Sequence, residues 1–153
     1  MKTKHVVYVV FCLFFLCCKH NDNTAESDFS LTSDLLSSYQ SIDDSVFNIR
    51  RHWVVERTSV NKVRIEETVE DLNQGGESYK RIYQDVSIKK EGDVYSLEFE
   101  HCKIDTKDHE VILGYAALDS AEPNHLFAHV IIQNVKTKSL VPHCEYGIAM
   151  KKI

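Results

Sequence analysis

The chain has 153 residues, of which 43% are hydrophobic and 27% charged, and this mixture predicts one globular domain rather than a repetitive or low-complexity chain. Two of its 18 basic side chains lie in the leader described next, so 16 remain against 23 acidic ones, a formal charge of −7. A net-negative domain repels phosphate backbones, which argues against nonspecific nucleic-acid binding.

Residues 1–18 have the layout of a secretory signal. Lys2 and Lys4 precede an unbroken apolar run of thirteen residues, VVYVVFCLFFLCC, which ends at Lys19. The run is shorter than the ~20 residues of a membrane-spanning helix and has the length of an export signal. We therefore expect a signal peptide over residues 1–18 and a protein that is secreted, periplasmic or exposed at the cell surface.

Two ways of processing this leader are open. Cleavage follows Cys18, or Cys17 or Cys18 becomes the first mature residue and carries a lipid, as in bacterial lipoproteins. The stretch LFFLCC loosely resembles a lipobox, with bulky Phe15 and Leu16 where smaller residues are usual. The polar stretch 19–30 is then a flexible linker, which in the second case tethers the domain to a membrane.

A helix is predicted directly after the linker. Thr32 or Ser33 can cap its first turn. Apolar side chains then recur at spacings of four, three and four residues, which places them on one helical face. These residues are Leu35, Tyr39, Ile42 and Val46.

After residue 50 the hydrophobic period changes to two, which is typical of half-buried strands. About seven strands are expected, over residues 52–55, 63–70, 79–88, 95–100, 111–118, 126–132 and 141–153. Short connections favour antiparallel hairpins, and a meander of this length must curl or be covered, because an open edge invites aggregation. The predicted fold class is mainly β, bordering on α+β: one domain over 31–153 with an N-terminal helix and a curled sheet or barrel.

Two cysteines, Cys102 and Cys144, belong to the domain itself. In an exported chain this even number favours a disulfide, which stabilises by about 3–4 kcal/mol through the unfolded state. His101 and His143 precede these cysteines. Adjacent strand residues point to opposite faces, however, and the short zinc-ligand spacings are absent. The sequence therefore predicts a Cys102–Cys144 disulfide and no metal site.

No catalytic or cofactor motif is recognisable in the chain. It has no Gly-rich phosphate loop, no Gly-x-Ser-x-Gly elbow and no His-Glu-x-x-His motif. His129 lies in the apolar run FAHVII and is expected to be a hydrogen-bonded core residue rather than a base. We therefore expect a protein that is not an enzyme and uses no cofactor.

Aromatic residues on the predicted strands are the remaining functional signal. They either fill the core or line a concave pocket for an apolar or aromatic ligand. An enclosed cavity between them favours a ligand carrier, whereas a filled core favours a protein-binding surface. They are Trp53, Tyr79, Tyr83, Tyr95, Phe99, Tyr115, Phe127 and Tyr146.

Three functions fit these observations. The first is an exported, non-catalytic binding or inhibitory protein that engages a protein partner, such as an immunity protein, an enzyme inhibitor or a factor that sequesters a host molecule. The second follows from the predicted helix, Trp53 on the first predicted strand and the terminal disulfide, which together resemble lipocalin-type proteins, with Arg51-His52-Trp53 in place of the usual Gly-x-Trp. That resemblance implies a barrel carrying a small apolar or aromatic ligand. The third is a membrane-anchored lipoprotein with an assembly role.

Overall fold

The computed structural model describes residues 35–42, 48–73, 76, 78–92, 94–142 and 147–153. The chain divides into two units, Met1–Ser30 and Leu31–Ile153, and the first lies wholly outside the described residues. The predicted signal peptide, the linker, Cys17 and Cys18 belong to that first unit and remain predictions. Among the described residues, no helix has the length and apolar character needed to cross a membrane.

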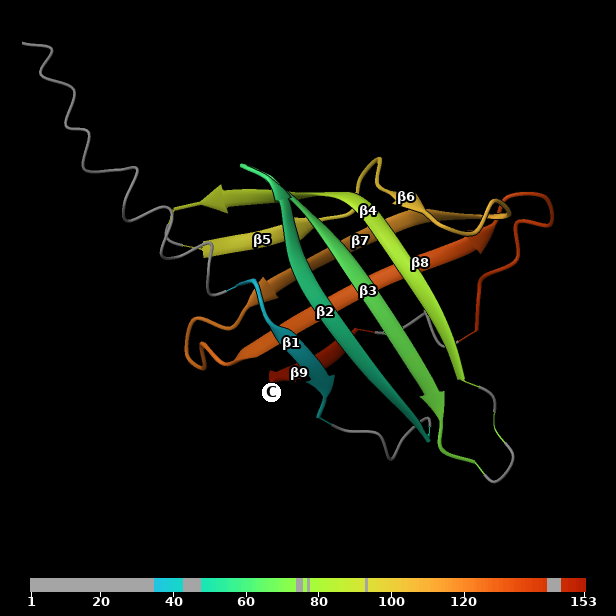
Figure 1. Cartoon of the computed structure of the whole chain (residues 1–153), viewed down its shortest axis with the longest axis horizontal. Helices are drawn as coiled ribbons and strands as arrows, with labels where there is room; N and C mark the ends of the chain where they lie inside the picture. Colours follow the sequence, from blue (N-terminus) through green and yellow to red (C-terminus); the bar gives the residue numbers. More distant parts are fainter. Residues whose placement is uncertain (1–34, 43–47, 74–75, 77, 93, 143–146) are drawn as a thin grey trace, which may run out of the picture. The chain divides into compact units, whose positions relative to one another are not determined.

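The described part of the second unit is built from strands, which confirms the mainly β prediction (Figure 1). In chain order they are β1 (Ser38–Ser41), β2 (Ile49–Ser59), β3 (Lys62–Asp71), β4 (Ser78–Glu91), β5 (Val94–Glu98), β6 (Lys103–Ile104), β7 (His109–Leu118), β8 (His125–Asn134) and β9 (Ile148–Lys152). All except β6 form a closed antiparallel barrel in the circuit β1-β2-β3-β4-β5-β7-β8-β9, and β9 pairs with β1 to close it. The short β6 pairs with β4 outside this circuit.

The predicted helix does not extend through the stretch that forms β1, because Leu35 has helical backbone but the chain is extended from Ser38 to Ser41. Ser38–Ser41 form β1, which pairs with β2 on one side and with β9 on the other. The barrel requires a strand here, because without β1 both β2 and β9 would present an open edge. Within β1, Tyr39 and Ser41 are buried and alternate with the half-buried Ser38 and Gln40, which is the period of two of a strand. The parts of the predicted helix before Leu35 and around Val46 lie outside the described residues.

Alternating side chains fill the barrel interior, as the period of two predicts. On β3 the inward residues Val63, Ile65 and Val69 are buried, and Tyr95 and Leu97 on β5 are buried in the same way. Burying a large apolar side chain stabilises a protein by about 1.5–3 kcal/mol, so this interior layer is the main source of stability. Further residues of the core cluster are Tyr39, Trp53, Tyr83, Phe99, Leu126, Ile132 and Met150.

β4 turns from one part of the barrel wall to the next. Its first part pairs with β3 and its last part with β5, and the register with β3 shifts opposite the stretch between Val63 and Ile65. Next to that shift, Asp85 adopts a left-handed φ of 62°, and its carboxylate lies 3.3 Å from Lys103 of β6. A bulge bends a strand and increases its twist, so this irregularity carries β4 around the barrel.

Candidate functional site

A charged cluster lies inside the barrel. Arg51 on β2, Glu67 on β3 and Arg81 on β4 occupy inward positions and are 3%, 0% and 4% exposed. β3 pairs with both β2 and β4, with Glu67 in register with Trp53 on one side and with Arg81 on the other. Within the described part of the chain, the cluster thus contains two guanidinium groups and one carboxylate.

Each oxygen of the Glu67 carboxylate has two partners. Oε1 lies 3.3 Å from Arg51 Nη1 and accepts a 3.0 Å hydrogen bond from Trp53 Nε1. Oε2 accepts hydrogen bonds from Arg81 Nη1 at 3.0 Å and from the Tyr83 hydroxyl at 2.8 Å. These four contacts satisfy the lone pairs of a carboxylate, so the cluster meets the condition under which a buried charge is tolerated.

The charge states within this cluster follow from its geometry. Burial works to raise the pKa of Glu67, but the charges of Arg51 and Arg81 and the hydrogen bonds from Trp53 and Tyr83 bring that pKa below its ordinary value. Burial and the charge of Glu67 raise the pKa of Tyr83 well above its ordinary value. At neutral pH Glu67 is therefore ionised, and Tyr83 is a neutral donor to it.

Next to this cluster, one end of the barrel contains a pocket of about 620 Å³, here called the mouth pocket. Its apolar lining comes from the ends of β2, β3 and β4 and from the segment after β8: Ile49, Val69, Tyr79, Val141 and Pro142. Its polar lining is Asp71, Lys80, Arg81, Thr106 and His109. The volume falls within the roughly 300–1,000 Å³ of small-molecule sites, which commonly combine apolar walls with a few polar groups.

Several polar side chains of the mouth pocket are held in place by their neighbours. The Arg81 guanidinium lies 4.5 Å from the centre of the Tyr79 ring, besides its bond to Glu67. Thr106 Oγ1 and His109 Nδ1 form a 3.1 Å hydrogen bond. Because Arg81 belongs to both the pocket and the charged cluster, the buried ion pairs position one of the pocket's own polar groups.

The predicted aromatic pocket is not formed as one site. Trp53, Tyr83 and Phe99 pack against one another, with ring centres 5.3–6.4 Å apart, and all three are fully buried. Tyr95 is also in the core. Of the predicted set, Tyr79 alone is among the described residues that line the mouth pocket. The interior between the aromatics is filled because inward side chains of a barrel this narrow meet at its centre.

Tyr115 and Phe127 lie on the outside of the barrel, and Tyr146 lies outside the described residues. Three successive outward cross-strand pairs of β7 and β8 are Leu113–Ile131, Tyr115–His129 and Ala117–Phe127, and the polar pair Glu110–Gln133 lies beyond them. No acidic side chain, lysine or arginine lies within these three successive pairs, and Ile112, Leu113, Tyr115 and Phe127 are 40–49% exposed. We call Ile112, Leu113, Tyr115, Phe127 and His129 the β7–β8 face.

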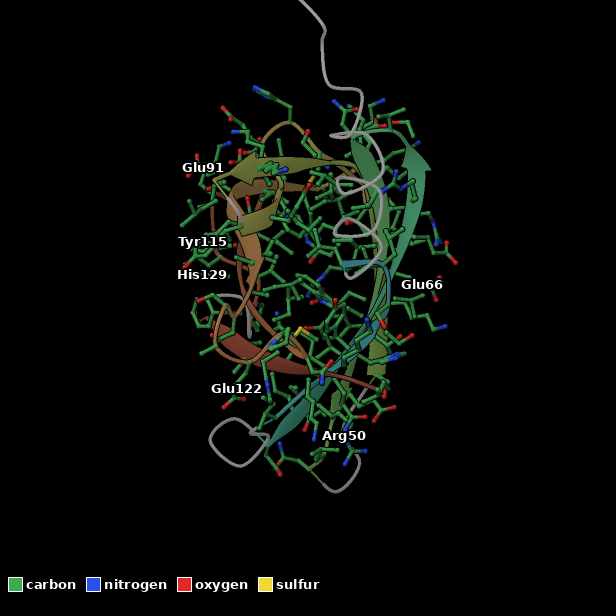
Figure 2. The ribbon with its side chains drawn as sticks, turned by 90° about the vertical axis from the view of Figure 1, so that its left-hand side faces the viewer. Arg50, Glu66, Glu91, Tyr115, Glu122 and His129 are labelled. Carbon is green, nitrogen blue, oxygen red and sulfur yellow. The ribbon has the colours of Figure 1, made fainter. Side chains whose placement is uncertain are left out.

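The opposite side of the barrel is charged. On β2 and β3 the outward pairs include Arg50–Glu70 and Arg64–Glu56, both of which are ion pairs. Figure 2 shows Tyr115 and His129 on one outer side of the barrel and Glu66 on the other. Exposed apolar clusters of this kind commonly mark interaction sites, whereas single exposed apolar residues do not.

His129 is not the hydrogen-bonded core residue that its sequence context predicted. Ala128 and Val130 occupy the inward positions of β8, so alternation directs His129 outward, where its ring meets the edge of Tyr115 at 6.2 Å. Its Nε2 atom is buried without a hydrogen-bond partner among the described residues. The surrounding apolar run reflects a strand with apolar residues on both faces rather than a doubly buried strand.

Cys102 is half-buried between β5 and β6. Burial, followed by the charge of Asp85, raises the pKa of its thiol to about 11. Cys144 and His143 lie outside the described residues, so the disulfide remains a prediction. In the part of the chain that the structure describes, no group of three or more His, Cys, Asp or Glu side chains is placed to hold a metal ion.

The residues that sequence reasoning missed are Arg51, Glu67 and Arg81. The signal that identifies them is the alternation itself: each charged residue occupies an inward position between apolar ones, as Glu67 does between Ile65 and Val69. Charges of opposite sign at core positions of neighbouring strands predict a buried ion-pair cluster.

Chemically, the barrel offers a preformed recess with apolar walls, aligned hydrogen-bond donors and a buried guanidinium, which is an arrangement suited to binding. Comparison with models of protein families, with curated proteins and with solved structures gives no match.

Proposed function

We propose that the mature chain is an exported, non-catalytic binding protein that holds a small, mainly apolar ligand in the mouth pocket. The observation that carries this proposal is the 620 Å³ recess at the end of the barrel, with Ile49, Val69, Tyr79 and Val141 in its walls. A closed antiparallel barrel is compatible with a lipocalin-like binder, since barrel mouths are common ligand sites.

The ligand site proposed here differs from a deep cavity between aromatic residues. Trp53, Tyr83 and Phe99 fill the middle of the barrel, and Arg81, which is bound to Glu67, lines the pocket. A ligand therefore enters no further than Arg81. The recess suits a compact molecule or one end of a longer chain.

Binding of a neutral fluorescent probe, N-phenyl-1-naphthylamine, tests this function. We expect the probe to bind the mature domain, and Val141→Trp, which fills the pocket from its rim, to weaken that binding at least tenfold. Val60→Trp is the matched control, because Val60 is 86% exposed in the β2–β3 hairpin away from the pocket. Probe binding that is absent, or that Val141→Trp leaves unchanged, contradicts the proposal.

A second candidate function, the capture of a protein partner, is supported by the β7–β8 face. Beside this face lies a hollow of about 510 Å³ whose lining includes Ile112, Leu113 and Tyr115 together with Glu98 and Glu100. Apolar surface beside carboxylates suits a partner protein that presents an apolar patch with basic residues next to it. Such a partner corresponds to the inhibitor or immunity class of function.

The test compares Leu113→Glu with Val60→Glu in a pull-down from the fluid into which the protein is exported. A partner that uses this face is retained by the wild type and by Val60→Glu and is lost with Leu113→Glu. Equal retention by all three proteins places the contact elsewhere and removes the β7–β8 face from the proposal.

Export itself is tested at the N-terminus. Mass spectrometry of the mature protein distinguishes a start at Lys19 from a lipid-modified Cys17 or Cys18, and the second result supports a membrane-anchored form with an assembly role. A mature protein that retains residues 1–18 unmodified contradicts the proposed location.

A further inference from the structure

The basic side chains of the mouth pocket are already paired with carboxylates. Lys80 Nζ lies 3.3 Å from Glu66 on the outer face of the barrel, and Arg81 Nη1 lies 3.0 Å from the buried Glu67. An ion that leaves water without gaining a counterion pays a large desolvation cost. An anionic ligand would meet that cost here, because both cations of the described lining already have a partner.

Asp71, the carboxylate of the described lining, belongs to the turn between β3 and β4. Its Oδ1 accepts hydrogen bonds from the backbone nitrogen of Asn73 at 2.9 Å and from the Asn73 side-chain amide at 2.6 Å. The side chain also packs on Gly76, where an added Cβ would lie 2.5 Å from Asp71 Cγ. This carboxylate therefore orders the turn, and a cationic ligand would have to compete with those contacts.

Thr106 and His109 form an uncharged polar part of the lining. The His109 backbone nitrogen donates to the Thr106 carbonyl oxygen at 3.2 Å, which closes a tight turn and brings the two side chains together. Thr106 Oγ1 and His109 Nδ1 then form a 3.1 Å hydrogen bond. With a neutral imidazole, this bond can run in either direction, and each direction leaves the pair one further donor and at least one further acceptor.

A ligand group that both donates and accepts hydrogen bonds matches such a pair. A hydroxyl or a primary amide does both, whereas a carboxylate only accepts and an ammonium only donates. A charged head therefore satisfies one half of the Thr106–His109 pair and finds no unengaged counterion among the other polar groups described above. The chemistry of the lining thus favours an uncharged head group.

We propose that the mouth pocket binds neutral amphipathic molecules that carry a hydroxyl or a primary amide, with this head at Thr106 and His109 and an apolar body along Ile49, Val69 and Val141. This inference rests on the proposed ligand-binding function and adds the chemical class of the ligand to it.

Ligands of equal chain length test the charge of the head. Octanol, octanoate and octylamine are each titrated against the mature domain loaded with N-phenyl-1-naphthylamine at pH 8, which favours neutral imidazole. We expect octanol to displace the probe at a concentration at least about tenfold lower than either charged ligand does. If octanoate or octylamine binds as tightly as octanol, or octanol fails to displace a bound probe, the neutral head group is wrong and the apolar site stands. A probe that does not bind at all contradicts the proposed function itself.

Substitution of Thr106 tests the position of the head. Thr106→Val keeps the shape of the side chain and removes the hydroxyl, so we expect octanol to bind about three- to tenfold more weakly. Methyl octyl ether, which is neutral but cannot donate, should lose less affinity, and Thr106→Ser should bind octanol as the wild type does. Thr58→Val is the matched control, because Thr58 is exposed near the end of β2 opposite to Ile49.

Comparison of the two ligands in the two proteins removes their different solubilities in water from the result. Near-ultraviolet circular dichroism checks that each variant is folded, and His109→Phe, with the same expected selectivity, replaces Thr106→Val if that variant is not. An equal loss of affinity for octanol and for the ether, or no loss for either in a folded variant, overturns the assigned position of the head group.

Discussion

Removal of the charge on Glu67 is expected to destabilise the barrel more than any change at the charged surface. Glu67→Gln keeps the shape of the side chain but removes the only carboxylate of the described cluster. One carboxylate oxygen is replaced by an NH₂ group, which cannot accept the hydrogen bonds that this oxygen accepts in the wild type. The donors to the two oxygens are Arg51 and Trp53 at Oε1 and Arg81 and Tyr83 at Oε2. Leaving buried charges without their counterion costs about 3–5 kcal/mol.

Urea unfolding followed by tryptophan fluorescence measures this effect, since Trp53 donates to Glu67 directly. With a denaturant slope of about 2 kcal/mol per molar, the expected loss lowers the midpoint by about 2 M. The control is Glu66→Gln, one residue away on the outer face, where Glu66 pairs with Arg64 and Lys80; its midpoint should hardly change. Equal midpoints for Glu67→Gln and the wild type would refute the claim that the cluster stabilises the barrel.

The pH dependence of the same measurement has a defined sign. The pKa of Glu67 is lower in the folded than in the unfolded chain, so its contribution is fully present above the unfolded value of about 4.3 and is lost as the pH falls through the folded value. The difference in unfolding free energy between the wild type and Glu67→Gln should therefore shrink on acidification below that range. A difference that widens there would contradict the assignment of Glu67 as the ionised partner.

Three further predictions concern single sites. Tyr83→Phe removes the hydroxyl that donates to Glu67 at 2.8 Å and should lower the unfolding free energy in urea by about 1.5–3 kcal/mol; no change would mean that the hydroxyl adds nothing to the cluster. Gly114→Ala places a Cβ 2.6 Å from Phe99 Cβ and should lower the unfolding free energy by about 1–3 kcal/mol in the same assay. An unchanged midpoint would show that the neighbouring side chains rearrange to accommodate the added methyl group. In a reduced Cys144→Ser variant, the raised pKa of Cys102 predicts alkylation by iodoacetamide at least about tenfold slower at neutral pH than in urea; equal rates would contradict it.

Much of the fold follows from local pattern. The period of two on β3 and β5 predicted which side chains are buried, and the short turns predicted antiparallel neighbours. The nature of β1 could not be predicted in this way, because Leu35, Tyr39 and Ile42 are spaced as on one helical face. The strand at Ser38–Ser41 depends on β2 and β9, which pair with β1 from distant parts of the sequence. Pairing between strands that are distant in sequence does not change the local hydrophobic period.

The candidate site was less predictable than the fold. Aromatic residues were identified as a set, but the set divides: Trp53 and Phe99 pack in the core, Tyr79 lines the mouth, and Tyr115 lies on the outer face. The sequence shows that a strand contains aromatic residues. Whether each one is buried depends on the face of the sheet to which it points and on its position along the barrel axis. The mouth pocket also combines strand ends with the segments after β6 and β8, and only the closed barrel brings these together.

Chemical-shift mapping by NMR tests the central claim, that the barrel binds its ligand at the mouth, most directly. Titration of the isotope-labelled mature domain with N-phenyl-1-naphthylamine is expected to shift the backbone amides of Val69, Tyr79, His109 and Val141 most strongly and to leave Leu113 and Tyr115 of the β7–β8 face unchanged. Shifts confined to the β7–β8 face, or a spectrum that the probe leaves unchanged, would contradict a ligand site at the barrel mouth.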